Sequence, residues 1–256
     1  MIDIHAHILP GIDDGSGGIK DTLQMLRTAA ASGVTGIVAT PHCNVPDSFA
    51  NYFDSLFLEL FDFVSQQIVE EGIPIDLMAG MEVFVTPQVP DLLMTGKLVT
   101  LNQSDYLLVE FDVEETPEFM WTMLTELAQI GVIPVVAHPE RYLIIQDRPW
   151  LVRHWLESGF GVQINKGSFQ GRFGYREQAT AHRLLQHRMV TVIASDAHTP
   201  YQRTTWLTDV YEELAEEYDE AYLDVLFAEN PRRICAGEPL IEAEMIPFFK
   251  RKDWME

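Results

Sequence analysis

Short apolar segments alternate with longer amphipathic ones along the chain, and this alternation limits the possible folds more than any other feature. The apolar segments predict seven strands, at Ile2–His5, Val34–Thr40, Ile75–Met81, Tyr106–Phe111, Val132–Ala137, Gly161–Ile164 and Val190–Ala194. The amphipathic segments predict helices at Ile19–Ser32, Ser48–Glu71, Pro87–Thr95, Pro117–Ile130, Pro149–Ser158, Glu177–His187, Thr204–Glu217 and Ala221–Phe227. Strands that alternate with helices pair in parallel through right-handed crossovers, so we expect an α/β barrel.

Size and composition favour one domain over residues 1–256. A chain of 256 residues with 47% hydrophobic residues can bury a sizeable core, and α/β barrels of this length fold undivided. No apolar run is long enough to span a membrane, and the first residues lack the features of a secretory signal, so no membrane insertion is expected. Two cysteines, Cys43 and Cys235, are too few for a disulfide framework and fit a cytoplasmic location.

The net charge of −22 argues against a nucleic acid partner, because such a surface repels polyanions at long range. Acidic residues are concentrated in Asp209–Asp224, which is interpreted as a solvated helix face. The one compact basic run, Lys250-Arg251-Lys252, is interpreted as part of a surface tail.

Histidine and carboxylate side chains gather at the ends of the predicted strands. Nine of them end a strand or lie in the segment just after one: His5, His7, Asp14, His42, Glu82, Glu110, His138, Asp196 and His198. In a parallel barrel all these ends meet at one rim, where such folds carry out their chemistry. Imidazole and carboxylate ligands suit zinc, manganese or iron. The sequence therefore predicts a metal site at the carboxyl rim.

Each of these residues taken alone has an ordinary structural explanation. One histidine at a strand end is more often a hydrogen-bonded structural residue than a ligand, and Glu110 or Asp196 could be a helix cap. Nine such residues over six strand ends favour the metal site. The other histidines, His154, His182 and His187, fall within predicted helices and are interpreted as surface or packing residues.

These residues stand within a series of short motifs. The motifs are His5-Ala6-His7, Asp13-Asp14-Gly15, Thr40-Pro41-His42, Gly80-Met81-Glu82, Val109-Glu110-Phe111, Ala137-His138-Pro139-Glu140-Arg141-Tyr142 and Ser195-Asp196-Ala197-His198. The series resembles the polymerase and histidinol phosphatase (PHP) superfamily, and within it the bacterial tyrosine-protein phosphatases of capsular and exopolysaccharide operons, the CpsB/CapC type. The resemblance covers nearly the whole chain, through Gly237. It implies a distorted TIM-like (β/α)7 barrel, the PHP fold.

The resemblance also implies three divalent metal ions, with manganese as the first expectation and iron, zinc or magnesium as alternatives. It assigns His5, His7, Glu82 and Asp196 to a first metal, Glu82, Glu110 and His138 to a second, and Asp14, His42 and His198 to a third. Cys43 departs from the His or Arg expected beside His42, and we interpret it as a small apolar filler.

Hydrolysis of a phosphate ester needs cationic groups around the phosphoryl oxygens. Arg141, three residues after His138, and Arg203, seven after Asp196, are predicted to contact the phosphate, with a structural salt bridge as the alternative for each. Asn165 and Lys166 follow the sixth strand and are further candidates for the mouth of the site. Neither cysteine begins the C-x5-R motif of a cysteine-dependent phosphatase, because Phe49 and Ile241 stand six residues beyond them.

The predicted function is a metal-dependent protein-tyrosine phosphatase that uses a metal-activated hydroxide, since a tyrosyl leaving group requires little protonation. The implied partner is a tyrosine-phosphorylated protein, the C-terminal tyrosine cluster of a bacterial tyrosine autokinase. Two alternatives remain open. One is a small-molecule phosphatase of the histidinol phosphatase kind, and the other is a metal-bound regulator of the kinase without catalysis. An amidohydrolase is disfavoured because Glu82 and Glu110 end the middle strands, where that class usually carries a carboxylated lysine.

Overall fold

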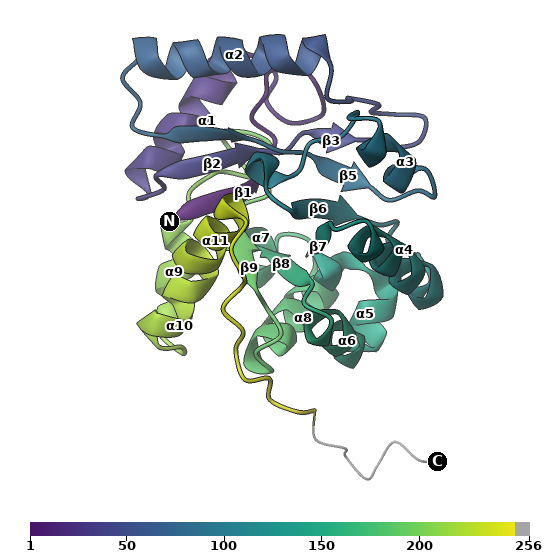
Figure 1. Ribbon diagram of the computed structural model, residues 1–256. Helices are drawn as coiled ribbons and strands as arrows, with labels where there is room; N and C mark the ends of the chain where they lie inside the picture. Colours follow the sequence, from purple (N-terminus) through teal and green to yellow (C-terminus); the bar gives the residue numbers. More distant parts are fainter. Residues whose placement is uncertain (249–256) are drawn as a thin grey trace.

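The structure, a computed structural model, describes residues 1–248, so the basic run at Lys250–Lys252 lies outside the described residues. Figure 1 shows strands surrounded by helices. The strands are β1 (Ile2–Ala6), β2 (Gly36–Ala39), β3 (His42–Cys43), β4 (Asp76–Ala79), β5 (Glu82–Phe84), β6 (Tyr106–Glu110), β7 (Ile133–Ala137), β8 (Gly161–Asn165) and β9 (Val192–Ala194). Every predicted strand is present.

The strands form two parallel sheets that together close a barrel. One sheet has the order β1-β2-β4 and the other the order β3-β5-β6-β7-β8-β9. The ring closes where β1 meets the residues after β9. There the backbone N–H of His7 donates to Ala197 O at 2.8 Å, and that of Asp196 donates to His5 O at 2.9 Å. The predicted distorted seven-stranded barrel is therefore confirmed.

Two strands of the barrel are each broken into two pieces, of which only the first was predicted, and the breaks account for the distortion. The second strand stops at Ala39 and resumes at His42 as β3, and the third stops at Ala79 and resumes at Glu82 as β5. Pro41, which has no N–H to donate to a ladder, occupies the first break. Gly80 occupies the second, where a Cβ would lie 2.6 Å from Val38 Cγ1. Beyond the breaks, β3 and β5 join the other sheet and carry His42 and Glu82 to the rim.

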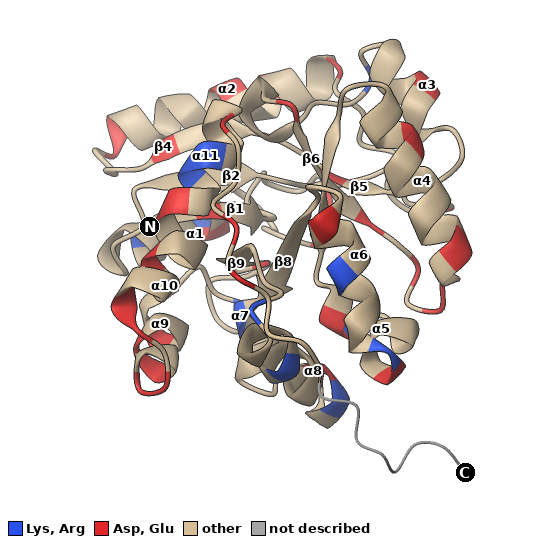
Figure 2. Cartoon of the chain, turned by 60° about the horizontal axis from the view of Figure 1, so that its bottom comes forward, with Lys and Arg blue, Asp and Glu red and all other residues tan. Residues whose placement is uncertain are grey.

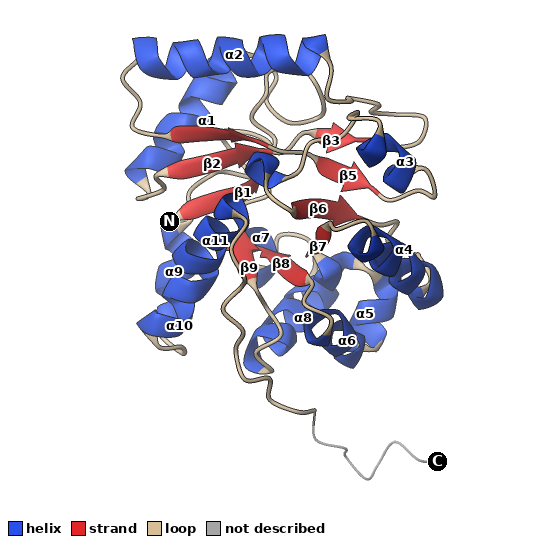
Figure 3. Ribbon diagram, viewed as in Figure 1, coloured by secondary structure: helices blue, strands red, loops and turns tan. Residues whose placement is uncertain are grey.

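The helices cover the outside of the barrel (Figure 3). They are α1 (Ile19–Ala31), α2 (Ser55–Glu70), α3 (Val89–Met94), α4 (Pro117–Gln129), α5 (Leu143–Asp147), α6 (Val152–Glu157), α7 (Lys166–Phe169), α8 (Tyr175–Gln186), α9 (Thr208–Ala215), α10 (Glu220–Asp224) and α11 (Asn230–Ala236). Three short helices, α5, α7 and α11, were not predicted. No helix among residues 1–248 is long and apolar enough to cross a membrane.

The predicted start of α2 at Ser48 was wrong, because α2 begins at Ser55. The preceding loop contains Asn44, Asp47 and Asn51 with positive φ, a conformation that interrupts a helix. Asp54 then caps α2, since its Oδ1 accepts hydrogen bonds from the first-turn N–H groups at 3.0 and 3.2 Å.

Apolar side chains fill the barrel and the space between barrel and helices. The inner cluster takes residues from strands around the ring, including Ile4, Val38, Leu108 and Val135, and Ile234 of α11 packs against it. The larger outer cluster packs the other strand faces against helices. The polar rim residues therefore stand on a rigid apolar base at one end of the barrel.

Candidate metal centre

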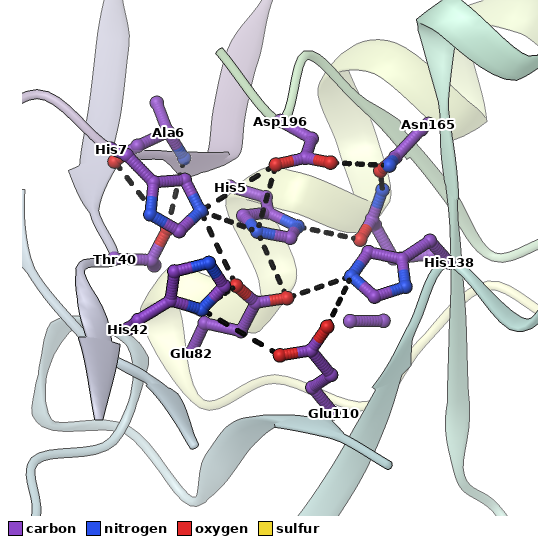
Figure 4. A network of polar contacts seen from close by, with 12 residues as sticks. His5, Ala6, His7, Thr40, His42, Glu82, Glu110, His138, Asn165 and Asp196 are labelled. Atoms are coloured by element: carbon purple, nitrogen blue, oxygen red, sulfur yellow. Dashed lines mark hydrogen bonds and ion pairs between the residues drawn. The ribbon is translucent and has the colours of Figure 1, made fainter. Parts of the chain in front are cut away.

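The nine predicted ligands lie together at the carboxyl ends of the strands, and Figure 4 labels all of them except Asp14 and His198. Their donor atoms form four overlapping groups, each with all atoms within 4.8 Å of one another: His7, Asp14, His42 and His198; His5, His7 and Asp196; His5, Glu82 and His138; and His42, Glu82 and Glu110. The groups contain the same nine residues as the three predicted sets but divide them differently. Glu110 and His138 fall in separate groups, and His5, His7, His42 and Glu82 each take part in two groups.

Glu82 lies at the centre of the cluster. Its Oε1 is 2.8 Å from His138 Nε2 and 3.3 Å from His5 Nε2. Its Oε2 is 2.9 Å from His42 Nδ1 and 3.3 Å from His7 Nε2. Because its two oxygens face different pairs of histidines, Glu82 has the geometry of a carboxylate that can bridge two cations.

His5 at the end of β1 and His7 just after it face this carboxylate, and the strand contains a bulge at this point. Asp3 pairs with Ile37 and Ala6 with Ala39, so β1 has one more residue than β2 between these pairs. A bulge redirects the side chains that follow it. His5 and His7 then share one side, because alternate residues of an extended chain do, and their Nε2 atoms lie 3.2 Å apart.

Two residues of the cluster have left-handed backbones that non-glycine residues seldom adopt: His138 has φ 34° and Asp196 has φ 50°. Strain of this kind is commonly found at functional sites, where the surrounding structure holds it in place. At the solvent-facing side, Asp14 Oδ1 lies 3.5 Å from His198 Nε2 and 3.6 Å from His42 Nε2.

Hydrogen bonds behind the cluster orient the imidazole rings. His5 Nδ1 is 2.8 Å from Gln163 Oε1, and His7 Nδ1 is 2.8 Å from Asp13 Oδ2. Since each of these acceptors takes the Nδ1 proton, Nε2 is left free to bind a cation. Neither Asp13 nor Gln163 was predicted from the sequence to be functional. Asp13 stands beside the predicted ligand Asp14, whereas no local signal marked Gln163 inside β8.

Asn165 and Lys166 do not line the mouth of the site, contrary to that hypothesis. Asn165 is fully buried, and its amide donates to Asp196 Oδ2 from behind the cluster. Lys166 is buried too, and its ammonium lies 3.4 Å from Asp209 Oδ1 and donates to Trp206 O. Both side chains are therefore occupied by contacts within the fold.

The residues interpreted as structural lie outside the four ligand groups. Cys43 is fully buried, and burial raises the pKa of its thiol to about 12, so it remains an uncharged filler. His154 is two-thirds exposed, His182 packs against Phe169, and His187 stacks on Phe248.

Arg141 and Arg203 approach one edge of the cluster from different loops. Arg141, after β7, has Nη1 4.0 Å from Asp196 Oδ2. Arg203, after β9, pairs with the same oxygen through Nη2, and its Nε donates to the backbone O of Asp196 at 3.1 Å. Their side chains are 31% and 29% exposed, so each guanidinium can still meet an anion from solvent.

The pKa shifts differ between neighbouring side chains of the cluster, so that neutral and charged groups lie side by side. Burial lowers the pKa of His138 to about 4, helped by Arg141, so this imidazole is neutral at pH 7. Burial and the Glu82 charge raise the pKa of Glu110 to about 8. Burial also opposes ionisation of Glu82, but His5 and the neighbouring histidines outweigh it and hold its pKa well below the usual range. Histidine protons therefore compensate the buried carboxylates, a role that cations can take over.

Buried polar atoms without hydrogen-bond partners are further evidence that the cluster fits divalent cations. The side-chain atoms Glu82 Oε2 and His42 Nδ1 lie 2.9 Å apart but are not aligned as a hydrogen bond, so both buried atoms lack a hydrogen-bond partner within residues 1–248. Buried polar atoms without partners are costly unless another group, such as an ion, binds them. Mixed nitrogen and oxygen donors in this arrangement suit manganese, iron or zinc.

Comparison with known proteins identifies relatives along nearly the full length. Residues 1–236 match the family model described as capsular polysaccharide synthesis, CpsB/CapC. The tyrosine-protein phosphatase YwqE of Bacillus subtilis is 32% identical over 98% of this chain and 98% of its own length. The tyrosine-protein phosphatase CpsB of Streptococcus pneumoniae is 29% identical over 93% of this chain and 99% of its own.

Solved structures agree with the fold. A structure from the work on YwqE of Bacillus subtilis and CpsB of Streptococcus pneumoniae, described as unique metal-dependent tyrosine phosphatases, superposes with a TM-score of 0.87 at 32% identity, covering 98% of this chain and 100% of that one. The lactonase Lmo2620 of Listeria monocytogenes superposes with a TM-score of 0.60 at 12% identity over 95% of each chain. This second likeness concerns the fold alone.

Proposed function

Because the chain belongs to the CpsB/CapC family of capsular polysaccharide synthesis, we propose that it is a metal-dependent protein-tyrosine phosphatase. The observation that carries the proposal is the meeting of four ligand groups with two partly exposed arginines at one rim. This combination suits a phosphate dianion, which needs cations and guanidinium groups on its oxygens. We treat residues 1–256 as one phosphatase domain.

We propose that three divalent ions, manganese in the first instance, are held by the nine residues of the cluster. Glu82 would bridge two of them, with His5, His7 and Asp196 on one side and His138 and Glu110 on the other. His42, Asp14 and His198 would hold the third. When bound, such ions supply a water that ionises near neutral pH and screen the negative charge of the phosphate.

The residues of the chain have three tasks in this scheme. Gln163 and Asp13 keep the histidines in the tautomer that presents Nε2. The apolar base beneath the rim excludes bulk water from one side of the cluster. Arg141 and Arg203 contact the phosphoryl oxygens, whose charge is spread over the equatorial positions in the transition state.

An aryl ester is the substrate class that this arrangement serves best. A phenol has a pKa near 10, so a tyrosyl group leaves without a strong general acid. We propose that the substrate is a tyrosine-phosphorylated protein, the C-terminal tyrosine cluster of a bacterial tyrosine autokinase, and that dephosphorylation regulates that kinase. The buried free thiols of Cys43 and Cys235 suit a cytoplasmic location.

The test compares substrates and metal states of the same preparation. Turnover of a phosphotyrosine peptide and of histidinol phosphate is measured before chelation, after chelation and after return of manganese. The proposal expects metal-dependent turnover with a strong preference for the peptide. A preference for histidinol phosphate would favour the small-molecule phosphatase, and metal-loaded protein without turnover of either substrate would favour the non-catalytic regulator.

A further inference from the structure

Phe173 contacts both arginines at the edge of the metal centre. It lies in the loop between α7 and α8, which follows β8, whereas Arg141 follows β7 and Arg203 follows β9. The guanidinium carbons of Arg141 and Arg203 each lie over its ring, 5.4 Å from the ring centroid. A cation within about 6 Å of an aromatic face is attracted by the ring quadrupole. One ring thus connects guanidinium groups from two different loops.

The ring is held in place by its own surroundings. A Cβ on Gly167 would lie 2.9 Å from Phe173 Cε2 and 3.3 Å from Arg172 Cδ, so this close approach requires glycine. Arg172 Nη1 donates to Gln202 O, and its Nε donates to Gln170 Oε1 at 3.1 Å. The loop that carries Phe173 is therefore joined directly to the residue before Arg203.

Two guanidinium groups that converge on one carboxylate repel each other, so their convergence has to be stabilised. Asp196 contributes charge from the side of the metal centre, since both arginines approach its Oδ2. Phe173, from the loop between α7 and α8, contributes the second contact without adding an acceptor that would compete with a phosphate. Basic residues are few in this acidic chain. Figure 2, in which Lys and Arg are blue, shows some of them on α7 and α8, the helices that flank this loop.

We propose that Phe173 is a positioning residue that holds Arg141 and Arg203 as a pair so that both guanidinium groups meet the phosphoryl oxygens of an aryl phosphate. The inference rests on the proposed function and specifies how the arginines are placed. A leucine of similar size would fill the space but offers no quadrupole, whereas tyrosine keeps the aromatic face. The difference between these two variants separates positioning from simple packing.

The experiment compares Phe173→Leu and Phe173→Tyr in the manganese-loaded protein. Tyr175→Leu is the matched control, because Tyr175 is 83% exposed and lies two residues away. Metal content, melting temperature, the Kd of inorganic phosphate, and kcat and KM on p-nitrophenyl phosphate are measured for each. Two exposed cation–π contacts together contribute about 1–2 kcal/mol, which corresponds to roughly a tenfold change. Phe173→Leu should weaken phosphate binding and kcat/KM about tenfold with its metals retained, and Phe173→Tyr should restore most of both.

Gly167→Ala provides a second route, since it displaces the ring without changing it and should reproduce the loss even if Phe173→Leu folds poorly. The inference would be overturned if Phe173→Leu and Gly167→Ala both bound phosphate and turned over substrate as well as the parent protein. It would also be overturned if Phe173→Leu and Phe173→Tyr lost phosphate affinity and kcat/KM equally. If the parent itself turns over no aryl phosphate, the proposed function fails instead, and the phosphate Kd values still report on the pairing of the arginines.

Discussion

At the scale of single residues, Glu82 has the most consequential position. Its carboxylate is buried among four histidines, and each oxygen faces two of them. The sequence predicted that Glu82 would be a ligand from its place after a strand. The bulge in β1 and the partner Gln163 could not be predicted, because both depend on contacts between strands that are distant in the sequence.

Replacing Glu82 with alanine should release metal, because a bridging carboxylate is lost from two sites at once. Elemental analysis should show at least one ion fewer per chain than in the parent protein. His154→Ala is the control, since His154 is exposed and lies outside the ligand groups. Unchanged metal content in Glu82→Ala would show that the coordination scheme is wrong.

Arg141→Ala should retain its metals and its melting temperature while kcat and kcat/KM fall together, by about 10²-fold. The reason is that Arg141 is part-exposed and its ion pair with Asp196 is long, at 4.0 Å. Arg141→Lys should recover only part of the activity, because a point charge cannot replace a planar fork. Metal loss or unfolding with normal turnover per loaded molecule would instead make Arg141 a structural residue.

Glu140 provides a prediction on pH. It is fully buried, and burial raises its pKa to about 7 from an ordinary 4.5. Between pH 4.5 and 7 the folded state holds this proton while the unfolded state releases it, so the free energy of unfolding falls as pH rises through this window, by about 3 kcal/mol in all. Glu140→Gln should lose this component. Urea unfolding of the metal-free parent and variant at pH 5 and pH 8 measures the change in the free energy of unfolding between these pH values. The same change in both proteins would show that Glu140 does not cause it.

At the scale of elements, the broken strands connect sequence to site. Apolar segments with β-branched residues identified seven of the nine strands within residues 1–248. The second and third predicted strands ended at Thr40 and Met81, so their continuations β3 and β5 were not predicted. Loop residues before α2, such as Phe49 and Phe53, extended the apolar pattern and led to the wrong helix start. Local patterns therefore predicted the longer helices and strands, whereas short elements, breaks and loop conformations depend on packing against neighbouring parts of the fold.

Gly80→Ala should test the second break. The added Cβ would lie 2.6 Å from Val38 Cγ1 and 3.0 Å from Leu101 Cδ2, so the strands must shift. Overpacking of this kind costs about 1–3 kcal/mol, and the shift should also reduce metal binding because Glu82 is two residues away. Denaturant unfolding and metal content measure the two effects. Gly18→Ala, whose Cβ meets nothing within 4 Å, is the control; equal stability of the two variants would contradict the packing argument.

At the scale of the whole molecule, the barrel brings ligands from distant parts of the chain to one rim, and its net charge of −22 favours the uptake of cations. The same charge repels a phosphorylated substrate, so the arginines and the metal ions must provide local attraction. The family and the fold follow from features spread along the sequence. The pairing of Arg141 and Arg203 through Phe173 became visible only in three dimensions.

The central claim is that the clustered ligands bind the ions on which phosphotyrosine hydrolysis depends. The most direct test is a stepwise return of manganese to the metal-free protein, with bound metal per chain and turnover of a phosphotyrosine peptide measured at each step. Turnover should be absent without metal and should rise as the sites fill, with no such rise in Glu82→Ala. Full turnover in protein shown to contain no bound metal would contradict the claim.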